Sequence, residues 1–383
     1  MKQVLKVVGE VGKKYGTCIV SEAGESFEIT TFRRDIGSVN HRKPAEVIFT
    51  DSLEEDALRR DFTCNAIYFN PKTETYIDPT GGIQDIQKGI LRFVGNPRER
   101  IEEDVLRILR YIRFKNRYNF QLADENYWEI FQNSTPLLKN LPIERIRQEL
   151  DGILLLDNNV QALDDLKKIG FLKLFLPELE VLESCLGNKH HQEGDVWIHT
   201  KMCLQEMNHI LKRENIEHED EKLLLLWAIL LHDIGKAPTF SRGEDGEAHY
   251  YDHERIGAEM FLQDIAPRLK FSNTFQDTIY FLIEEHLRLF KIPQMRKLKT
   301  RTLMMHPYFP LLLKLGEADN RGRIPTKEEA FAHIGEIYQK FQTLLETKRF
   351  LTGDDVMERY PDLEGREIGD KLKALNDQIL IEG

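Results

Sequence analysis

The sequence predicts an α+β fold in which a small β-rich front part is followed by helical parts only. Three observations predict it. Stretches with strand-like alternation, separated by turn residues, fill residues 1–94. After Pro97 the apolar residues recur with helical period through most of the chain. Pro177 and the segment 187–194, which begins and ends with glycine, interrupt that pattern and mark a boundary before a second helical block.

The individual elements follow from these patterns. Strands are expected in TCIV, SFEITTF, AEVIFT, CNAIYFN and TYIDP, and the segment DPTGG (78–82) is a strong turn. Helices are expected at about 99–118, 124–134, 142–156 and 159–169, and through most of residues 195–348. The changes of pattern predict domains at 1–94, 95–180 and 181–345, followed by a C-terminal helical segment at 346–383.

Composition and charge limit the class of protein. The chain has 383 residues, of which 41% are hydrophobic, and its longest apolar run, Leu223 to Leu231, is far too short to span a bilayer. We expect a cytoplasmic protein without a signal peptide, whose four unpaired-looking cysteines stay reduced. The net charge is −11, but residues 1–150 carry 23 basic and 23 acidic side chains, so any phosphate-binding surface is local.

The most apolar helical stretch, KLLLLWAILLHDIGK, ends in His232 and Asp233. Because this stretch is apolar on every face, its end is buried, and a buried charged pair is costly unless a partner or a metal satisfies it. An ordinary helix end, terminated by Gly235 and complemented by the charge of Lys236, is the alternative interpretation.

Two distant residues favour a metal site. His199 lies upstream in VWIHTKMCL, inside another helical pattern, and Asp319 lies downstream in GEADNRGR. With the His-Asp pair they supply two imidazoles and two carboxylates, a mixed set suited to a divalent transition ion or Mg²⁺. His253 and His286 could reach the same cavity, but each could equally be a hydrogen-bonded core histidine.

This spacing resembles the H…HD…D signature of the HD superfamily of metal-dependent phosphohydrolases. The residues that match it are His199, His232, Asp233 and Asp319. The resemblance implies that these four bind a divalent metal, that His232 and Asp233 are catalytic, and that metal-activated water attacks a phosphoester. Residues 181–345 are then an HD phosphohydrolase domain, with Lys236, His253 and His286 as candidates for contacts to the metal ligands or the substrate.

The stretch DALRRDFTCNAIYFN places Arg59, Arg60 and Asp61 ahead of an alternating strand. Two adjacent arginines beside carboxylates can clamp a triphosphate, because guanidinium groups bind phosphate oxygens bidentately. A surface salt bridge is the alternative, and this stretch alone does not decide between them.

The stretch EEDVLRILRYIRF has an apolar helical stripe, with Asp104, Arg107 and Tyr111 on the neighbouring face. Asp104 and Arg107 are i, i+3 neighbours, so an acceptor and a forked donor face one side and match the edge of cytosine or adenine. An intrahelical ion pair, worth about 0.2–0.5 kcal/mol, is the alternative.

The order of these stretches resembles that of the class II CCA-adding nucleotidyltransferase and poly(A) polymerase family. The sequences FEITTFRRD, DALRRDFTCNAI, YIDPTGGIQDIQKGI, EEDVLRILRYIRF and LPIERIRQEL follow the family's order between residues 7 and 155 or so. The resemblance implies that residues 1–94 are part of a nucleotidyltransferase head with a palm sheet. It also implies that residues 95–180 are a helical neck carrying the helix that selects the nucleotide, and that an HD domain follows.

The same resemblance implies roles for single residues. Arg60 and Asp61 are expected to contact the incoming nucleotide, and Asp104 and Arg107 to pair with CTP or ATP. Glu28 matches the third acid of the palm and is expected to be catalytic. In the family it joins two aspartates of a DxD motif, which follows a GGxVRD loop, and the three carboxylates hold Mg²⁺ for transfer to the 3′ end of tRNA.

Neither the GGxVRD loop nor the DxD motif is present in this sequence ahead of Glu28, since no aspartate precedes Asp35. We therefore expect the sequence to begin inside the palm, and little or no nucleotide transfer by this polypeptide. Three explanations stay open: a misassigned start, a paralogue that kept only the HD chemistry, and a second chain that supplies the missing half.

Three hypotheses for function remain. The first is a tRNA 3′-terminal nucleotidyltransferase that uses CTP and ATP and carries an HD phosphohydrolase. The second is a free-standing HD phosphohydrolase for 2′,3′-cyclic or monoester phosphates on an RNA-binding scaffold, and the third is a non-catalytic RNA-binding protein. The basic cluster at 291–301 is more simply a solvated helix face than an RNA contact, and residues 35–48 are a candidate flexible loop.

Overall fold

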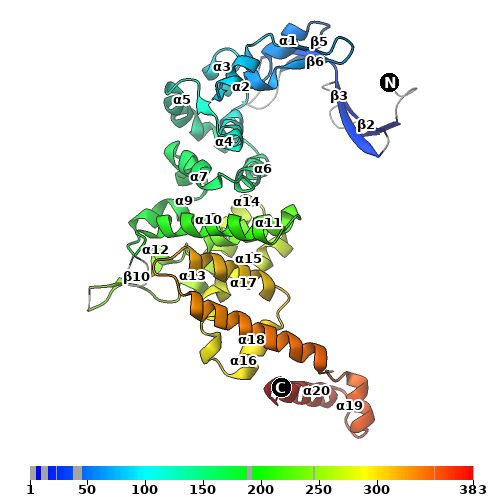
Figure 1. Cartoon of the computed structure of the whole chain (residues 1–383), viewed down its shortest axis with the longest axis vertical. Coiled ribbons are helices and arrows are strands. Elements are labelled where there is room, and N and C mark those ends of the chain that lie inside the picture. Colours follow the sequence, from blue (N-terminus) through cyan, green and yellow to red (C-terminus); the bar gives the residue numbers. More distant parts are fainter. Residues whose placement is uncertain are drawn as a thin grey trace. The chain divides into compact units, whose positions relative to one another are not determined.

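The computed structural model of the chain describes residues 6–9, 16–22, 24–37, 45–187, 192–244, 246–348 and 350–382. The chain divides into two compact units, Met1–Leu176 and Pro177–Gly383 (Figure 1). Small sheets occupy the start of the first unit and helices make up most of the rest, so the predicted α+β class is confirmed. Within the described ranges, no helix is long and apolar enough to cross a membrane.

Short antiparallel sheets begin the first unit. Strands β1 (Lys6–Gly9), β2 (Thr17–Glu22) and β3 (Glu25–Thr30) form a three-stranded sheet in that order. Two further pairs are β4 (Arg33–Ile36) with β5 (Glu46–Phe49), and β6 (Tyr68–Asn70) with β7 (Thr75–Ile77). These strands therefore lie in separate small sheets. Of the candidate loop at 35–48, residues 38–44, including Arg42, lie outside the described residues.

The strand predicted in CNAIYFN is shorter than expected. Its first residues form a 3-10 turn, η2 (Thr63–Asn65), and pairing starts only at Tyr68. The predicted turn at 78–82 is present, because the Asp78 carboxylate accepts the backbone N–H groups of Gly82 and Ile83 at 2.8 and 2.9 Å. These bonds satisfy free donors at the start of the next helix.

Helices then build the remainder of the first unit. They are α1 (Leu53–Leu58), α2 (Gly82–Gln87), α3 (Pro97–Glu103), α4 (Arg107–Tyr118), α5 (Asn126–Ser134), η3 (Thr135–Asn140), α6 (Ile143–Leu154), α7 (Asn159–Lys168) and α8 (Phe171–Phe175). A short parallel pair, β8 (Ile90–Leu91) with β9 (Gln121–Leu122), lies among them. Helix α4 packs on α6 and α7, which makes it the centre of the helical part of this unit.

The helix predicted at 99–118 is interrupted, so that prediction was wrong in its middle. Asp104 has an extended backbone (φ −147°, ψ 102°), and its side chain accepts the N–H of Leu106 at 3.2 Å. A short polar side chain that binds nearby backbone groups competes with helix formation in this way. Tyr111 was also misplaced on the nucleotide-facing side, since it is fully buried, stacks on Phe93 and donates its hydroxyl to the Leu91 carbonyl oxygen.

The second unit is a helical assembly with one hairpin. Its first elements are α9 (Pro177–Glu180), η4 (Val181–Ser184), α10 (Val196–Arg213), α11 (Glu219–Leu231), α12 (Lys236–Thr239), β10 (Phe240–Arg242), β11 (Ala248–Tyr250) and α13 (His253–Met260). The others are η5 (Phe261–Ile265), α14 (Ala266–Leu269), α15 (Asn273–Phe290), η6 (Ile292–Gln294), α16 (Lys297–Met304), α17 (Phe309–Arg321), α18 (Glu328–Thr347), α19 (Gly353–Arg359) and α20 (Arg366–Glu382). The β10–β11 hairpin departs from the purely helical architecture expected here.

Four helices form the centre of the second unit: α10, α11, α15 and α17 pack on one another, and α13 packs on α15 (Figure 1). From Leu225 to Leu231 every residue of α11 is buried, as its all-round apolar sequence predicted. The polar residues that follow α11 are consequently delivered into the interior of the unit.

The basic cluster at 291–301 has a structural role. The Nζ atom of Lys297 donates to the Ile381 carbonyl oxygen at 3.4 Å, and the Arg301 guanidinium donates to the Leu380 carbonyl oxygen. Both acceptors lie in the last turn of α20, where carbonyl groups lack intrahelical partners. This cluster therefore holds the C-terminal helix against α16.

A close backbone approach fixes the turn after α11. A Cβ atom added to Gly235 would lie 2.1 Å from the His253 carbonyl oxygen and 2.6 Å from the Gly257 nitrogen. No side chain can occupy that space unless the backbone moves. Glycine at this position lets α13 contact the turn directly.

We predict that Gly235→Ala destabilises the second unit by about 1–3 kcal/mol, because the new methyl group overlaps backbone atoms. Gly335→Ala in α18 is the matched control, since a Cβ there meets nothing within 4 Å and alanine favours a helix by up to about 1 kcal/mol. Urea denaturation of both variants measures the difference. An unchanged midpoint for Gly235→Ala would contradict the close approach.

Candidate functional site

The structure brings all four predicted metal ligands together in the second unit. His199 projects from α10, His232 and Asp233 follow α11, and Asp319 lies near the end of α17. His253, at the start of α13, and His286, in α15, join them. All six side chains are buried. Residues far apart in the sequence thus meet where the central helices pack.

The Asp233 carboxylate lies between two sets of imidazoles. Its Oδ2 atom is 3.2 Å from His232 Nε2 and 3.5 Å from His199 Nε2. Its Oδ1 atom is 3.2 Å from His253 Nε2 and 3.9 Å from His286 Nε2. Each oxygen of one side chain therefore faces a different pair of nitrogen donors.

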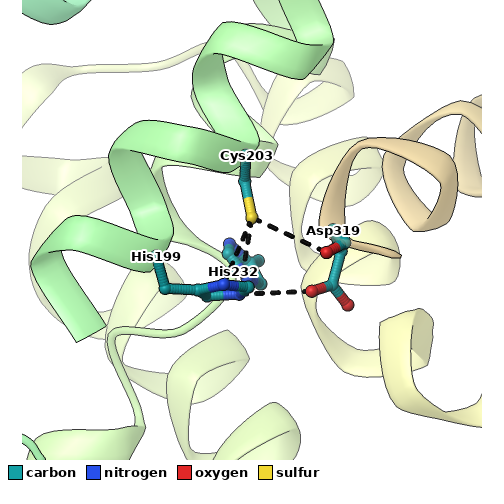
Figure 2. A group of neighbouring side chains, drawn as sticks. All are labelled: His199, Cys203, His232 and Asp319. Atoms are coloured by element: carbon teal, nitrogen blue, oxygen red, sulfur yellow. Dashed lines mark hydrogen bonds and ion pairs between the residues drawn. The ribbon is translucent and has the colours of Figure 1, made fainter. Parts of the chain in front are cut away.

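Potential ligand atoms form two groups around this carboxylate. The first donor group is His199, Cys203, His232 and Asp319, and the second donor group is Asp233, His253 and His286. Within each group the ligand atoms lie within 4.8 Å of one another. Figure 2 shows the first donor group, with His199 Nε2 at 3.2 Å from Asp319 Oδ1.

The Nδ1 atom of each of the four histidines, which points away from Asp233, has a nearby oxygen acceptor. The acceptors are Ile229 O at 2.7 Å for His232, Tyr250 O at 2.8 Å for His253, Ile283 O at 2.6 Å for His286, and Glu193 Oε1 at 2.8 Å for His199. A carbonyl oxygen can only accept, so in His232, His253 and His286 Nδ1 carries the proton and Nε2 is turned to the interior. Metal-binding histidines are oriented in this manner. Burial alone would lower the pKa of His199, but Cys203, Asp319 and Glu193 raise it well above its usual value.

The inner nitrogens fit a cation. Although each lies 3.2 Å from an Asp233 oxygen, His232 Nε2 and His253 Nε2 are buried with no hydrogen-bond partner among the described residues. A buried lone pair without a donor is costly. Imidazole and carboxylate donors of this mixture suit a divalent transition ion. The residues present therefore fit the divalent metal that the resemblance to the H…HD…D signature implies.

Burial and charge shift the protonation of this centre. Burial alone would raise the pKa of Asp233, but His232 and Lys236 hold it well below its usual range. Burial and the neighbouring imidazoles lower the pKa of His286 to about 3, so this ring is neutral at pH 7. Burial raises the pKa of the Cys203 thiol to about 11, although His199 acts in the opposite direction. An anionic carboxylate and neutral imidazoles are the forms that bind metal.

A cavity of about 300 Å³ opens beside the second donor group. Lys236, Arg323 and Lys327 place cationic side chains along it, and Lys236 Nζ donates to Asp233 Oδ2 at 2.6 Å. The hairpin contributes aromatic groups, of which Tyr251 is 72% exposed and stacks on His249. Cations beside a metal centre, with an aromatic rim, can receive a phosphate attached to a nucleoside.

Three participants in this centre were missed from the sequence. Cys203 follows His199 by four residues, so helical spacing alone places both on one face and was a usable signal. Glu193 reaches His199 from the segment before α10, and His249 lines the cavity from the hairpin. Glu193 and His249 lie outside the helices, so no helical spacing in the sequence could have predicted that they reach the site.

A second cavity, of about 890 Å³, lies in the first unit and is rich in arginine. Its arginines are Arg33, Arg34, Arg59, Arg60, Arg100, Arg107, Arg110, Arg113 and Arg145. Asp61 and Asp104 also line it, so all four residues that were predicted to bind nucleotide meet here. Glu28 does not line this cavity, but lies exposed on β3 opposite Ile19 of β2.

One buried carboxylate organises the adjacent arginines. Asp56 is fully buried. Its Oδ1 atom accepts hydrogen bonds from Nε and Nη2 of Arg59 at 2.8 and 2.5 Å. Its Oδ2 atom accepts hydrogen bonds from Nε and Nη2 of Arg60 at 3.1 and 2.9 Å. Tyr68 adds a hydroxyl donor to Oδ2. These bidentate bonds hold two consecutive guanidinium groups at fixed positions on the cavity wall.

The predicted base-reading residues each have another partner. Asp104 Oδ2 accepts from Arg145 at 3.1 Å, whereas Arg107 donates to Glu103 Oε2 at 2.7 Å. The break between α3 and α4 places them on either side of a turn instead of on one continuous helix. The expectation of an i, i+3 pair on a single helix face was therefore wrong, although both residues line the cavity.

Asp61 is engaged in a buried ion pair. Its Oδ2 accepts two nitrogens of Arg110 at 2.9 and 2.6 Å, and its Oδ1 accepts from Asn65 and from the Phe62 backbone. Burial alone would raise the pKa of Asp61, but the charge of Arg110 and these hydrogen bonds lower it below its usual value.

We predict that Arg110→Met destabilises the first unit by about 2 kcal/mol at pH 7, less than a fully buried pair because Arg110 is partly exposed. Since the folded pKa of Asp61 lies below the unfolded value of about 3.9, the stabilisation is complete above about pH 5 and is lost as the pH falls. Urea denaturation should show a smaller difference in unfolding free energy between wild type and Arg110→Met near pH 3.5 than at pH 7. Arg117→Met, an exposed change on the same helix, should cost under about 0.5 kcal/mol.

Three protein families match successive parts of this chain. The poly A polymerase head domain family matches residues 1–92, the family described as a probable RNA and SrmB-binding site of polymerase A matches 119–182, and the HD domain family matches 196–326. Among curated proteins, the CCA-adding enzyme of Limosilactobacillus reuteri is 35% identical over 210 residues, which is 54% of this chain and 51% of that one. That of Geobacillus thermodenitrificans is 41% identical over 170 residues, 44% of this chain and 41% of that one.

Solved structures show the same fold. A Bacillus stearothermophilus CCA-adding enzyme in complex with CTP superposes with a TM-score of 0.63 at 22% identity, covering 99% of this chain and 80% of that one. A CCA-adding enzyme in complex with ATP gives a TM-score of 0.63 at 18% identity, covering 99% and 77%. The chain spans about half the length of the curated relatives that it matches.

Proposed function

We propose that this chain, as a member of the class II CCA-adding nucleotidyltransferase and poly(A) polymerase family, acts on the 3′ end of tRNA through two sites. The second unit supplies a metal-dependent phosphohydrolase centre of the HD type. The first unit supplies a cavity for CTP and ATP. The observation that carries the hydrolase proposal is the common orientation of the four imidazoles, whose Nε2 atoms all face Asp233.

The two donor groups are proposed to hold two divalent ions, with Asp233 contributing one oxygen to each. This extends the single ion expected from the H…HD…D spacing, and it assigns ligand roles to His253 and His286 because their Nε2 atoms face Asp233 Oδ1. When bound, such ions supply Lewis-acid activation of water and of phosphate oxygens. The protein's own part is to fix the donors, to exclude bulk water, and to offer Lys236, Arg323 and Lys327 to phosphate.

The aromatic rim favours a nucleotide over a simple phosphate ester. Tyr251 is exposed at the cavity, and its ring stacks on that of His249 with the ring centroids 5.3 Å apart. A base can stack on such a platform whatever its identity. The terminal phosphate of an RNA chain, or its 2′,3′-cyclic form, is the substrate class that combines a stacked base with a phosphoester.

We predict that the double variant His232→Ala/Asp233→Ala lowers hydrolysis of 2′,3′-cyclic nucleotides by about a thousandfold, equivalent to roughly 4 kcal/mol of lost transition-state stabilisation. Chelation of wild-type protein should remove the same activity, and a divalent ion should restore it. His209→Ala is the control, because this histidine is exposed on α10 and pairs only locally with Glu206. Activity that survives in the double variant would count against the assigned centre.

Nucleotide binding by the first unit is supported by the arginine cavity. Arg59 and Arg60 are fixed by Asp56 in positions that suit a triphosphate, and Asp104 and Arg107 supply the acceptor and donor for a base edge. Arg107 is held by Glu103 in this structure, so we propose that nucleotide takes over that guanidinium.

We predict that Arg107→Ala weakens CTP and ATP binding by about 10- to 100-fold, the loss of one charge-assisted pair. Isothermal titration calorimetry measures it directly. Arg98→Ala is the matched control, because Arg98 is exposed on α3 and does not line the cavity. Equal affinity of wild type and Arg107→Ala would exclude the proposed contact.

Nucleotidyl transfer is the activity that the names of the relatives support for the first unit, with Glu28 as one of several Mg²⁺ ligands. Because the DxD carboxylates are absent ahead of Glu28, and Glu28 lies exposed outside the arginine cavity, we expect little or no transfer by this polypeptide alone. The free-standing hydrolase is the alternative. Incubation with labelled CTP or ATP and a tRNA that lacks its terminal nucleotides separates the two. Incorporation supports transfer, whereas hydrolysis without incorporation supports the alternative.

A further inference from the structure

Cys203 belongs to the first donor group by position, although the H…HD…D pattern has no place for it. It lies one helical turn after His199 on α10 and is fully buried. Its Sγ atom is 3.4 Å from His199 Nε2 and 3.9 Å from the Asp319 carbonyl oxygen (Figure 2). The thiol therefore lies against the imidazole of His199 and the backbone of Asp319.

The separations match those between neighbouring ligands of one zinc ion at tetrahedral angles, and Asp233 Oδ2, at 3.5 and 3.2 Å from His199 and His232 Nε2, would be a fifth ligand. Zinc bound by imidazole at about 2.0–2.1 Å and by thiolate at about 2.3 Å places these two donors about 3.6 Å apart. The observed Nε2 to Sγ separation is 3.4 Å for His199 and Cys203. For an imidazole and a carboxylate the same geometry gives about 3.3 Å, and His199 Nε2 lies 3.2 Å from Asp319 Oδ1.

An independent observation supplies a fourth donor. His232 is 1% exposed, its Nδ1 is satisfied by Ile229, and its Nε2 has no hydrogen-bond partner among the described residues. One ring nitrogen of His232 lies within 4.8 Å of the ligand atoms of the other three members. Two nitrogens, one oxygen and one sulfur thus converge on the same small volume.

We propose that the Cys203 thiolate is a ligand of the ion held by the first donor group, and that this position therefore takes zinc or a similarly thiophilic ion instead of Mg²⁺. Sulfur donors select soft and borderline ions, whereas Mg²⁺ requires oxygen ligands. Cys203 would hold the ion as a thiolate, so binding would require the thiol to lose its proton. The proposal rests on the proposed phosphohydrolase centre and names the class of ion at one of its two positions.

X-ray absorption of the full-length protein loaded with zinc tests this directly. We expect a sulfur scatterer at about 2.3 Å from zinc in the wild type. In Cys203→Ser the sulfur shell should disappear, while Cys185→Ala, which removes another buried thiol of the same unit, should retain it. Zinc affinity of Cys203→Ser should fall by more than about tenfold, with Mg²⁺ binding unchanged.

The possible results distinguish the role of Cys203 from the phosphohydrolase proposal. Bound zinc surrounded only by nitrogen and oxygen overturns the role of Cys203 and leaves the phosphohydrolase proposal standing. Failure of wild-type protein to retain zinc, together with full chelator-sensitive activity in Mg²⁺, likewise overturns the thiolate ligand alone. Failure to bind any divalent ion overturns both. If Cys203→Ser does not fold, the wild-type spectrum still gives the answer.

Discussion

A single buried carboxylate, Asp233, is the centre of the candidate site in the second unit, because both of its oxygens face imidazole nitrogens. Its Oδ2 atom also accepts from Lys236 Nζ at 2.6 Å. A buried anion of this kind is costly unless positive charge surrounds it. Lys236 compensates for it only in part, and the divalent ions that we propose here would supply the remainder. The centre and the packing of the helices around it therefore depend on one another.

The backbone determines which nitrogen each histidine presents. Three of the four outer nitrogens donate to a carbonyl three residues earlier in the chain, and His199 instead uses Glu193. These bonds fix the rings before any ion arrives, so ordering them costs little on binding. Gly235 contributes in another way, because its missing side chain lets the start of α13 approach the turn that carries Asp233. The turn that carries Asp233 therefore also carries the glycine that allows α13 to pack closely.

Features that depend on residue type and order could be predicted from the sequence, whereas contacts made by irregular segments could not. The apolar character of α11 and the order of His199, His232, Asp233 and Asp319 were sufficient to predict that these four side chains meet in the interior, because both are properties of residue type and order. Glu193 and His249 reach it from irregular segments and a hairpin, where no period exists to extrapolate. In the first unit the helical period ran through Asp104, yet a local side-chain bond broke the helix there. Asp56 was overlooked because its importance comes from two arginines whose orientation only the fold determines.

The central claim is that Asp233 is shared by two ions, and metal stoichiometry tests it most directly. Wild-type protein, His253→Ala and Asp233→Ala would be loaded with Co²⁺, freed of excess by gel filtration and analysed by mass spectrometry of the metal. The account predicts two ions per chain in the wild type, one in His253→Ala and none held tightly in Asp233→Ala. A wild type that holds one ion, unaffected by His253→Ala, would contradict the shared carboxylate.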